Sequence, residues 1–252
     1  MFIDTHTHLY SKQFDSDRED MLQRAIAAGI ELMLLPNIDL ESVGPMHRLE
    51  DAHPKHIRSM MGLHPGSVEN DWAEQLDLLY PWFAKRTYVA VGEIGIDLYW
   101  RQDNLAEQKA AFLRQLDWSL ELGLPVVIHS RESTGIILEL LADKPIKGVF
   151  HCFSGSEEEA HAIIARGMYL GIGGVLTYKA NEALRQLIAK VDRSKVILET
   201  DSPYLAPVPF RGKRNESAYV LHVADCLAGL WGMSTAEVGA LTTANARKLF
   251  NL

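Results

Sequence analysis

Eight short apolar runs alternate with stretches of helical periodicity, and this alternation constrains the fold more than any other feature of the chain. The runs begin 20 to 36 residues apart and occupy residues 2–4, 32–36, 57–63, 89–91, 125–128, 148–150, 168–172 and 196–198. Short runs of consecutive apolar residues are typical of strands buried on both faces, as in parallel sheets. Their spacing fits a series of strand-helix units.

Helical patterns fill the gaps between the runs, at residues 15–28, 72–85, 104–122, 156–165 and 181–191. Ser156 followed by Glu159 predicts a capping box at the start of one of these helices. Two further helical stretches, 215–231 and 234–250, follow the last run with no strand between them. We expect these two to pack outside the strands and to close one end of the fold.

The chain has the size and composition of one α/β domain. Its 252 residues are 47% hydrophobic and 23% charged, which excludes an intrinsically disordered protein. Single α/β barrels run to about 250 residues, so we expect one domain spanning residues 1–252.

Cysteine usage and the terminal sequence indicate a cytoplasmic protein. Cys152 and Cys226 are too few for a disulfide framework and lack C-x-x-C spacing. The N-terminus shows no signal-peptide pattern, and no apolar run approaches the roughly 18 residues that span a bilayer. We expect no membrane segment and no stable protein partner.

Polar side chains with catalytic potential stand at or just past the ends of six of the eight runs: His6, His8, His64, Glu93, His129, His151 and Asp201. An eight-stranded barrel and an open doubly wound sheet both fit the strand count. An open sheet would spread these residues across its width, whereas a barrel brings them to one rim, where barrel enzymes have their active sites. We therefore predict a (β/α)8 TIM barrel with extra C-terminal helices.

The residue types at this rim predict two metal positions that share one carboxylate. His6 and His8 are two apart on an extended segment and point the same way. Glu93 lies between Gly92 and Gly95, and a buried carboxylate needs a cation or a donor, an arginine salt bridge being the alternative. The predicted ligands are His6, His8, Glu93 and Asp201 for one ion and Glu93, His129 and His151 for the other. Two divalent cations from among Mg, Mn, Zn, Fe and Co fit such ligands, and the metal stays open.

Further residues at the rim are candidates for binding a phosphate. His64 precedes Pro65 and is either a substrate contact or a side chain held by that turn. Arg131 follows His129 by two residues, and Lys213 and Arg214 belong to a basic loop after the last run that is either a phosphate contact or a solvated charge run. The net charge of −8 excludes a basic protein that coats nucleic acid. It leaves a nucleic-acid substrate possible, because bound cations add local positive charge.

The motifs HTH, GLHP, GEIGID, HSR, HCFSG and ETDSPYL occur in this order along nearly the whole chain. With them the sequence resembles the TatD-like metal-dependent hydrolases, the deoxyribonuclease group of the amidohydrolase superfamily. The resemblance implies a (β/α)8 barrel, two divalent cations and phosphodiester hydrolysis, often as an exonuclease on DNA. It matches the two ligand sets above, and it matches His64 to a phosphate-contacting histidine. Ser217 replaces the proline that usually follows RGKRNE, which bears on the rigidity of that loop.

The expected activity is therefore a TatD-type, metal-dependent DNase acting on single-stranded DNA or frayed ends. Glu93, Asp201 and His64 are the expected catalytic residues: Asp201 orients or deprotonates the attacking water, and His64 and Arg131 hold phosphoryl oxygens. One alternative is a metal-dependent ester or amide hydrolase such as a D-aminoacyl-tRNA deacylase. Another is a structural metal-binding barrel without turnover.

Overall fold

Each of the eight apolar runs contributes a parallel strand in the computed structural model, which describes residues 1–252. The strands are β1 (Phe2–Asp4), β2 (Ile30–Leu35), β3 (Ile57–Ser59), β4 (Val91–Asp97), β5 (Val126–Arg131), β6 (Gly148–Phe150), β7 (Tyr169–Ile172) and β8 (Val196–Leu198). Strands β1 to β3 pair in sequence order, and so do β4 to β8. Chain neighbours are therefore neighbours in space, as strand-helix units require.

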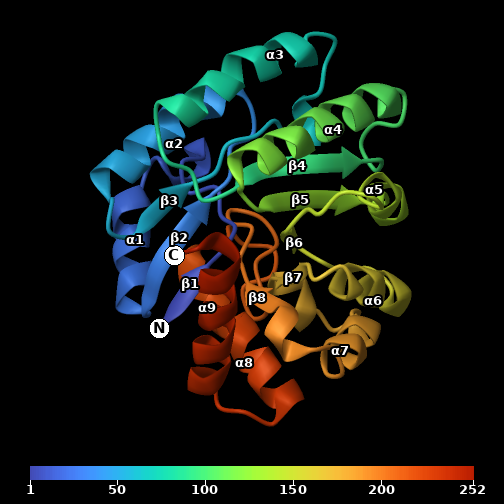
Figure 1. Ribbon diagram of the computed structural model, residues 1–252. Coiled ribbons are helices and arrows are strands. Elements are labelled where there is room, and N and C mark those ends of the chain that lie inside the picture. Colours follow the sequence, from blue (N-terminus) through green and yellow to red (C-terminus); the bar gives the residue numbers. More distant parts are fainter.

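Backbone hydrogen bonds at two seams join these two groups of strands into a ring. Between β3 and β4, the Met61 N–H donates to the Ala90 carbonyl and the Gly92 N–H donates to the Met61 carbonyl. Between β8 and β1, the Thr5 N–H donates to the Leu198 carbonyl at 3.0 Å. Figure 1 shows the resulting ring, with β1 beside β8. The predicted (β/α)8 barrel is confirmed.

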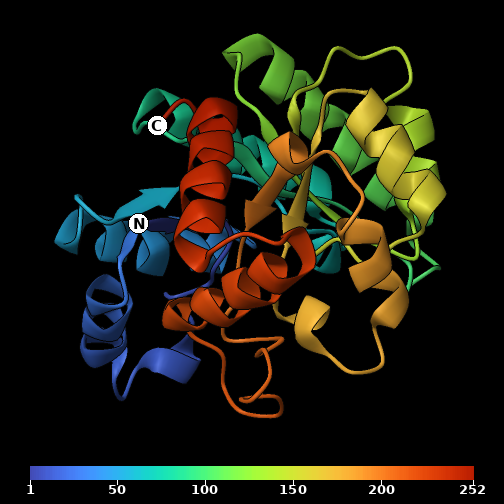
Figure 2. The ribbon, with the colours of Figure 1, turned by 90° about the horizontal axis from the view of Figure 1, so that it is seen from below.

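Helices surround the barrel (Figures 1 and 2). They are α1 (Arg18–Ala27), α2 (Leu40–Ala52), α3 (Trp72–Leu79), α4 (Leu105–Leu122), α5 (Thr134–Leu140), α6 (Glu157–Ala165), α7 (Glu182–Ile188), α8 (Val220–Trp231) and α9 (Thr235–Phe250). Six short 3-10 helices complete the set: η1 (Lys12–Phe14), η2 (Pro65–Ser67), η3 (Tyr80–Ala84), η4 (Gly174–Thr177), η5 (Arg193–Lys195) and η6 (Ser217–Tyr219). None of the helices combines the length and the apolar character that crossing a bilayer demands.

The helix ends follow local chemistry. The capping box of Ser156 and Glu159 is present at the start of α6. The expected helix at 72–85 divides into α3 and η3, because Pro81 near the start of η3 has no N–H with which to continue the α-helical ladder.

An apolar layer fills the barrel interior beneath the polar rim. It takes one side chain from each strand or from the residue beside it: Ile3, Leu34, Met60, Ala90, Val127, Val149, Tyr169 and Ile197. Ala246, Leu249 and Phe250 of α9 belong to the same cluster, so α9 closes the amino-terminal end of the barrel. Side chains two apart on a strand share a face, so His129 follows Val127 and His151 follows Val149 on the inward face.

Strand β4 contains the irregularity that places Glu93. Val91 pairs with Val126 and Ile94 pairs with Ile128, so β4 has one more residue than β5 between these pairs. Such a bulge re-aims a side chain and is common beside active sites. The expectation that this strand ends at residue 91 is wrong, because backbone pairing continues to Asp97 through glycines and polar residues that interrupt the apolar run. Glu93 therefore lies inside the strand.

The larger apolar cluster, between strands and helices, includes Phe112 of α4, which is fully buried. We expect Phe112→Ala to lower the free energy of unfolding by about 3–5 kcal/mol, because it removes a buried ring and leaves a cavity. Leu120→Ala, on the exposed side of the same helix, should change it by less than about 0.5 kcal/mol. Urea denaturation of both variants checks this, and equal losses would contradict the packing described.

Candidate metal centre and active site

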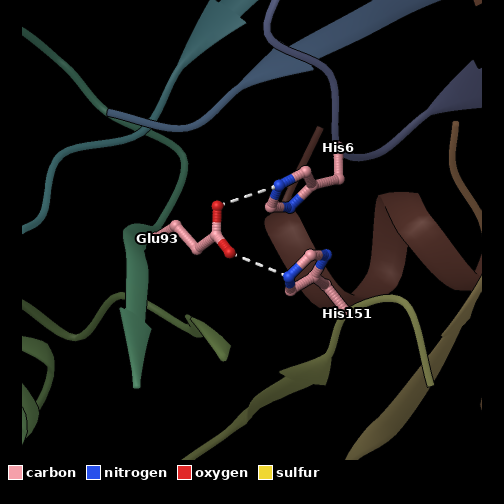
Figure 3. Close-up of side chains that lie close together, drawn as sticks. All are labelled: His6, Glu93 and His151. Carbon is pink, nitrogen blue, oxygen red and sulfur yellow. Dashed lines mark ion pairs between the residues drawn. The ribbon is translucent and has the colours of Figure 1, made fainter. Parts of the chain in front are cut away.

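The carboxylate of Glu93 is buried at the centre of the rim, with two histidines beside one of its oxygens and three beside the other. Oε2 lies 3.1 Å from His6 Nε2 and 3.7 Å from His8 Nε2. Oε1 lies 2.8 Å from His151 Nε2 and 3.0 Å from His129 Nδ1. Figure 3 shows His6 and His151 approaching the carboxylate from the segments that follow β1 and β6. The structure thus places the two predicted residue groups on either side of the carboxylate that they were expected to share.

Asp201 belongs with the first of these pairs. Its Oδ1 lies 3.5 Å from His8 Nε2 and 3.7 Å from His6 Nε2. The residue follows β8, and the closure of the barrel between β8 and β1 brings it beside the two histidines. The six predicted ligands therefore converge on one small volume.

A tyrosine hydroxyl determines which nitrogen of His8 faces the centre. The Tyr10 hydroxyl donates to the Pro36 carbonyl at 2.6 Å, so it has no proton left for His8. At 3.0 Å from His8 Nδ1 it must accept, which places the proton of the neutral ring on Nδ1. The lone pair on His8 Nε2 then points at the centre, as a metal ligand requires.

Asp97 does the same for His129. Its Oδ2 lies 2.8 Å from His129 Nε2, and an ionised carboxylate can only accept. The proton of the neutral ring therefore lies on Nε2, and the lone pair on Nδ1 faces Glu93. The sequence analysis did not single out Tyr10 or Asp97. Their signals were a hydroxyl two residues after His8 and an acid four residues after Glu93 in the same buried segment.

His64 presents the opposite chemistry. The Gly66 N–H donates to His64 Nδ1 at 2.9 Å, so the proton of the neutral ring lies on Nε2. That nitrogen points into the centre, 3.4 Å from Glu93 Oε1. Burial lowers the pKa of His64, which keeps the ring neutral at pH 7. His64 therefore offers a hydrogen-bond donor where His8 and His129 offer lone pairs.

The electrostatics of the centre fit bound cations. Burial alone raises the pKa of Glu93, but the surrounding imidazoles, His151 and His6 first, outweigh it and hold that pKa well below its ordinary value. Glu93 has only imidazoles as ion-pair partners within 4 Å, so the alternative of an arginine salt bridge is wrong. An ionised, buried carboxylate surrounded by imidazoles forms a donor set suited to divalent cations, whose binding would displace the ring protons.

A cavity of about 450 Å³ opens directly over this centre. Its lining includes His64, His129 and Arg131, so the structure brings the first predicted phosphate contacts to the site. The volume lies within the roughly 300–1,000 Å³ of small-ligand pockets. The cavity can therefore admit one nucleotide-sized group beside Glu93.

The basic loop lies elsewhere. Neither Lys213 nor Arg214 lines the cavity, so the cavity gives no support to the expectation that both bind substrate. The Arg214 guanidinium is held by the carboxylate of Asp17 through two contacts of 2.7 Å and lies over the ring of Phe14. Its charge is used to tie the loop to the segment before α1. The loop is thus anchored without the usual proline, whose place Ser217 takes.

Comparisons with known proteins agree with this geometry. The family model described as "TatD related DNase" matches residues 3–251. The "Uncharacterized metal-dependent hydrolase YabD" of Bacillus subtilis is 32% identical over 255 residues, covering 100% of both chains. The "3'-5' ssDNA/RNA exonuclease TatD" of Escherichia fergusonii is 34% identical over 258 residues, covering 99% of each.

A solved structure shows the same fold. The crystal structure of YJJV, a TatD homologue from Escherichia coli K12, superposes with a TM-score of 0.92 at 31% identity, covering 100% of this chain and 98% of that one. Family match, sequence relatives and fold agree along the whole length. The chain belongs to the TatD-related DNase family and is a metal-dependent hydrolase.

Proposed function

We propose that this chain, acting as one domain of residues 1–252, hydrolyses phosphodiester bonds at the ends of single-stranded DNA or RNA with two divalent cations. The observation that carries the proposal is the buried Glu93 carboxylate. His6 and His8 lie beside its Oε2, and His129, His151 and the donor His64 lie beside its Oε1. Relatives along the full length are named as single-strand exonucleases, which supports nucleic acid as the substrate.

The proposed ligands divide between the two carboxylate oxygens. Oε2 of Glu93, His6, His8 and Asp201 hold one cation, and Oε1 of Glu93, His129 and His151 hold the other. The cations supply Lewis-acid polarisation of the phosphoryl group and lower the pKa of the attacking water. Imidazole nitrogens favour Mn, Fe, Co or Zn over Mg in such a set.

The side chains of this protein supply the remaining steps. Burial alone raises the pKa of Asp201, but its contacts with His8 and His6 lower it overall, so the carboxylate is ionised at pH 7 and accepts the proton of the attacking water. His64 donates its Nε2–H to a phosphoryl oxygen. Arg131, whose guanidinium offers a planar pair of donors, holds a second oxygen.

Activity on a labelled oligonucleotide tests the reaction and the substrate together. With Mn²⁺ added, the wild-type chain should shorten an end-labelled single-stranded oligonucleotide. Asp201→Asn should lose this activity and keep a wild-type unfolding transition, because the amide cannot take the proton. Gel analysis of 5′- and 3′-labelled strands gives the rates. Deacylation of D-aminoacyl-tRNA with the oligonucleotide left intact would contradict the proposal, as would full activity of the variant.

Alanine variants at two histidines separate the donor role of His64 from the ligand role of His129. His64→Ala should lower kcat by about 10²–10³ and leave the metal content unchanged, because it removes one hydrogen bond to the developing charge. His129→Ala should lower the metal content as well as kcat. Elemental analysis of the two purified variants, run beside the rate assay, distinguishes them. Metal loss from His64→Ala would make that residue a ligand and refute its assignment as a donor.

A further inference from the structure

The mouth of the cavity is bordered by large aromatic side chains that are exposed to solvent. Trp100, after β4, is 73% exposed, and Tyr204, after β8, is 50% exposed. Both line the same cavity as Glu93. Exposing an indole to water is unfavourable, and exposed apolar side chains beside a polar cleft commonly mark a binding surface. The two-cation chemistry makes no use of either ring.

One carboxylate, that of Asp97, fixes the position of the Trp100 backbone relative to the metal centre. Oδ1 of Asp97 accepts hydrogen bonds from the backbone N–H groups of Tyr99 and Trp100, at 2.9 and 3.1 Å. The other oxygen of Asp97 binds His129. The carboxylate is itself buried, so the loop that carries the indole is anchored to a proposed metal ligand.

The side chains of Tyr99 and Arg131 pack beside the indole of Trp100. The guanidinium of Arg131 lies 3.7 Å from the centroid of the Tyr99 ring and 5.6 Å from that of Trp100. The rings of Tyr99 and Trp100 meet edge to face, with centroids 4.9 Å apart. Stacked cations and edge-to-face aromatic pairs limit the freedom of these side chains. Arg131, the proposed phosphate contact, therefore also packs against the aromatic side chains.

We propose that Trp100 is the stacking surface for the base of the nucleotide whose phosphate is hydrolysed at Glu93. This inference rests on the proposed function and deepens it, because it states how the site selects its substrate. Every base has a π-face, so stacking is tolerant of sequence, but a base must leave a duplex before it exposes that face to a side chain. Trp100 thereby favours unpaired ends over paired ones.

The test is a cycle of two changes, one in the protein and one in the substrate. Wild-type chain and Trp100→Ala each receive a single-stranded oligonucleotide and the same oligonucleotide with an abasic nucleotide at the end that is attacked. A stacked base contributes about 1–3 kcal/mol, so we expect Trp100→Ala to lower kcat/KM on the ordinary oligonucleotide at least about fivefold. The preference for the ordinary over the abasic substrate should shrink by the same factor.

Two further variants sharpen the cycle. Trp100→Phe keeps a π-face and should restore most of the preference. Leu78→Ala removes an exposed apolar side chain on α3 and should leave both rates unchanged.

An equal loss on both substrates, or no loss on either, would overturn the stacking role while hydrolysis by the wild-type chain upholds the proposed function. Failure of the wild-type chain to hydrolyse either oligonucleotide would instead refute the proposed function.

Discussion

Burying the carboxylate of Glu93 costs several kcal/mol unless cations or hydrogen-bond donors surround it, and much of the rim is arranged to meet that cost. The groups that do so come from β5 and from the segments after β1, β3, β6 and β8, which meet only because the ring of strands is closed. The bulge in β4 aims the side chain at them. Barrel closure, the bulge and the polar rim thus together surround one buried charge with compensating groups.

A second layer of hydrogen bonds gives the imidazoles around Glu93 different properties. Tyr10 and Asp97 take the outer protons of His8 and His129, and the backbone of Gly66 instead occupies the outer nitrogen of His64. Identical side chains thereby present a lone pair to the centre in two cases and a hydrogen-bond donor in the third. Asp97 also holds the loop of Trp100, so one carboxylate connects the metal chemistry with the proposed selection of an unpaired base.

Much of this arrangement was predictable from the sequence. The physical reasons for this also explain which features were not predictable. Apolar runs report buried strands, and polar residues that follow them at the same end must gather when the strands are parallel, so His6, His129 and Asp201 were found together. The run at 89–91 stops where glycine and polar residues begin, although pairing continues, so the place of Glu93 inside β4 escaped prediction. Apolar character alone does not show how far a strand pairs with its neighbour or which residues pair.

Pairings between distant side chains were equally hidden. The carboxylate that occupies Arg214 lies 197 positions away along the chain, and nothing in the basic loop itself indicates it. A run of basic residues in the sequence does not indicate where each side chain points. Only the fold shows that Arg131 lines the cavity and that Arg214 does not. Trp100 was passed over for the same reason, because an aromatic residue in a loop shows its exposure only in three dimensions.

The most direct test of the central claim is anomalous X-ray scattering from crystals of the Mn²⁺-loaded protein. The account predicts two peaks, one on each side of the Glu93 carboxylate. One should be bounded by His6, His8 and Asp201 and the other by His129 and His151, with His64 outside both coordination spheres. A single peak, peaks away from Glu93, or His64 bound directly to an ion would contradict it.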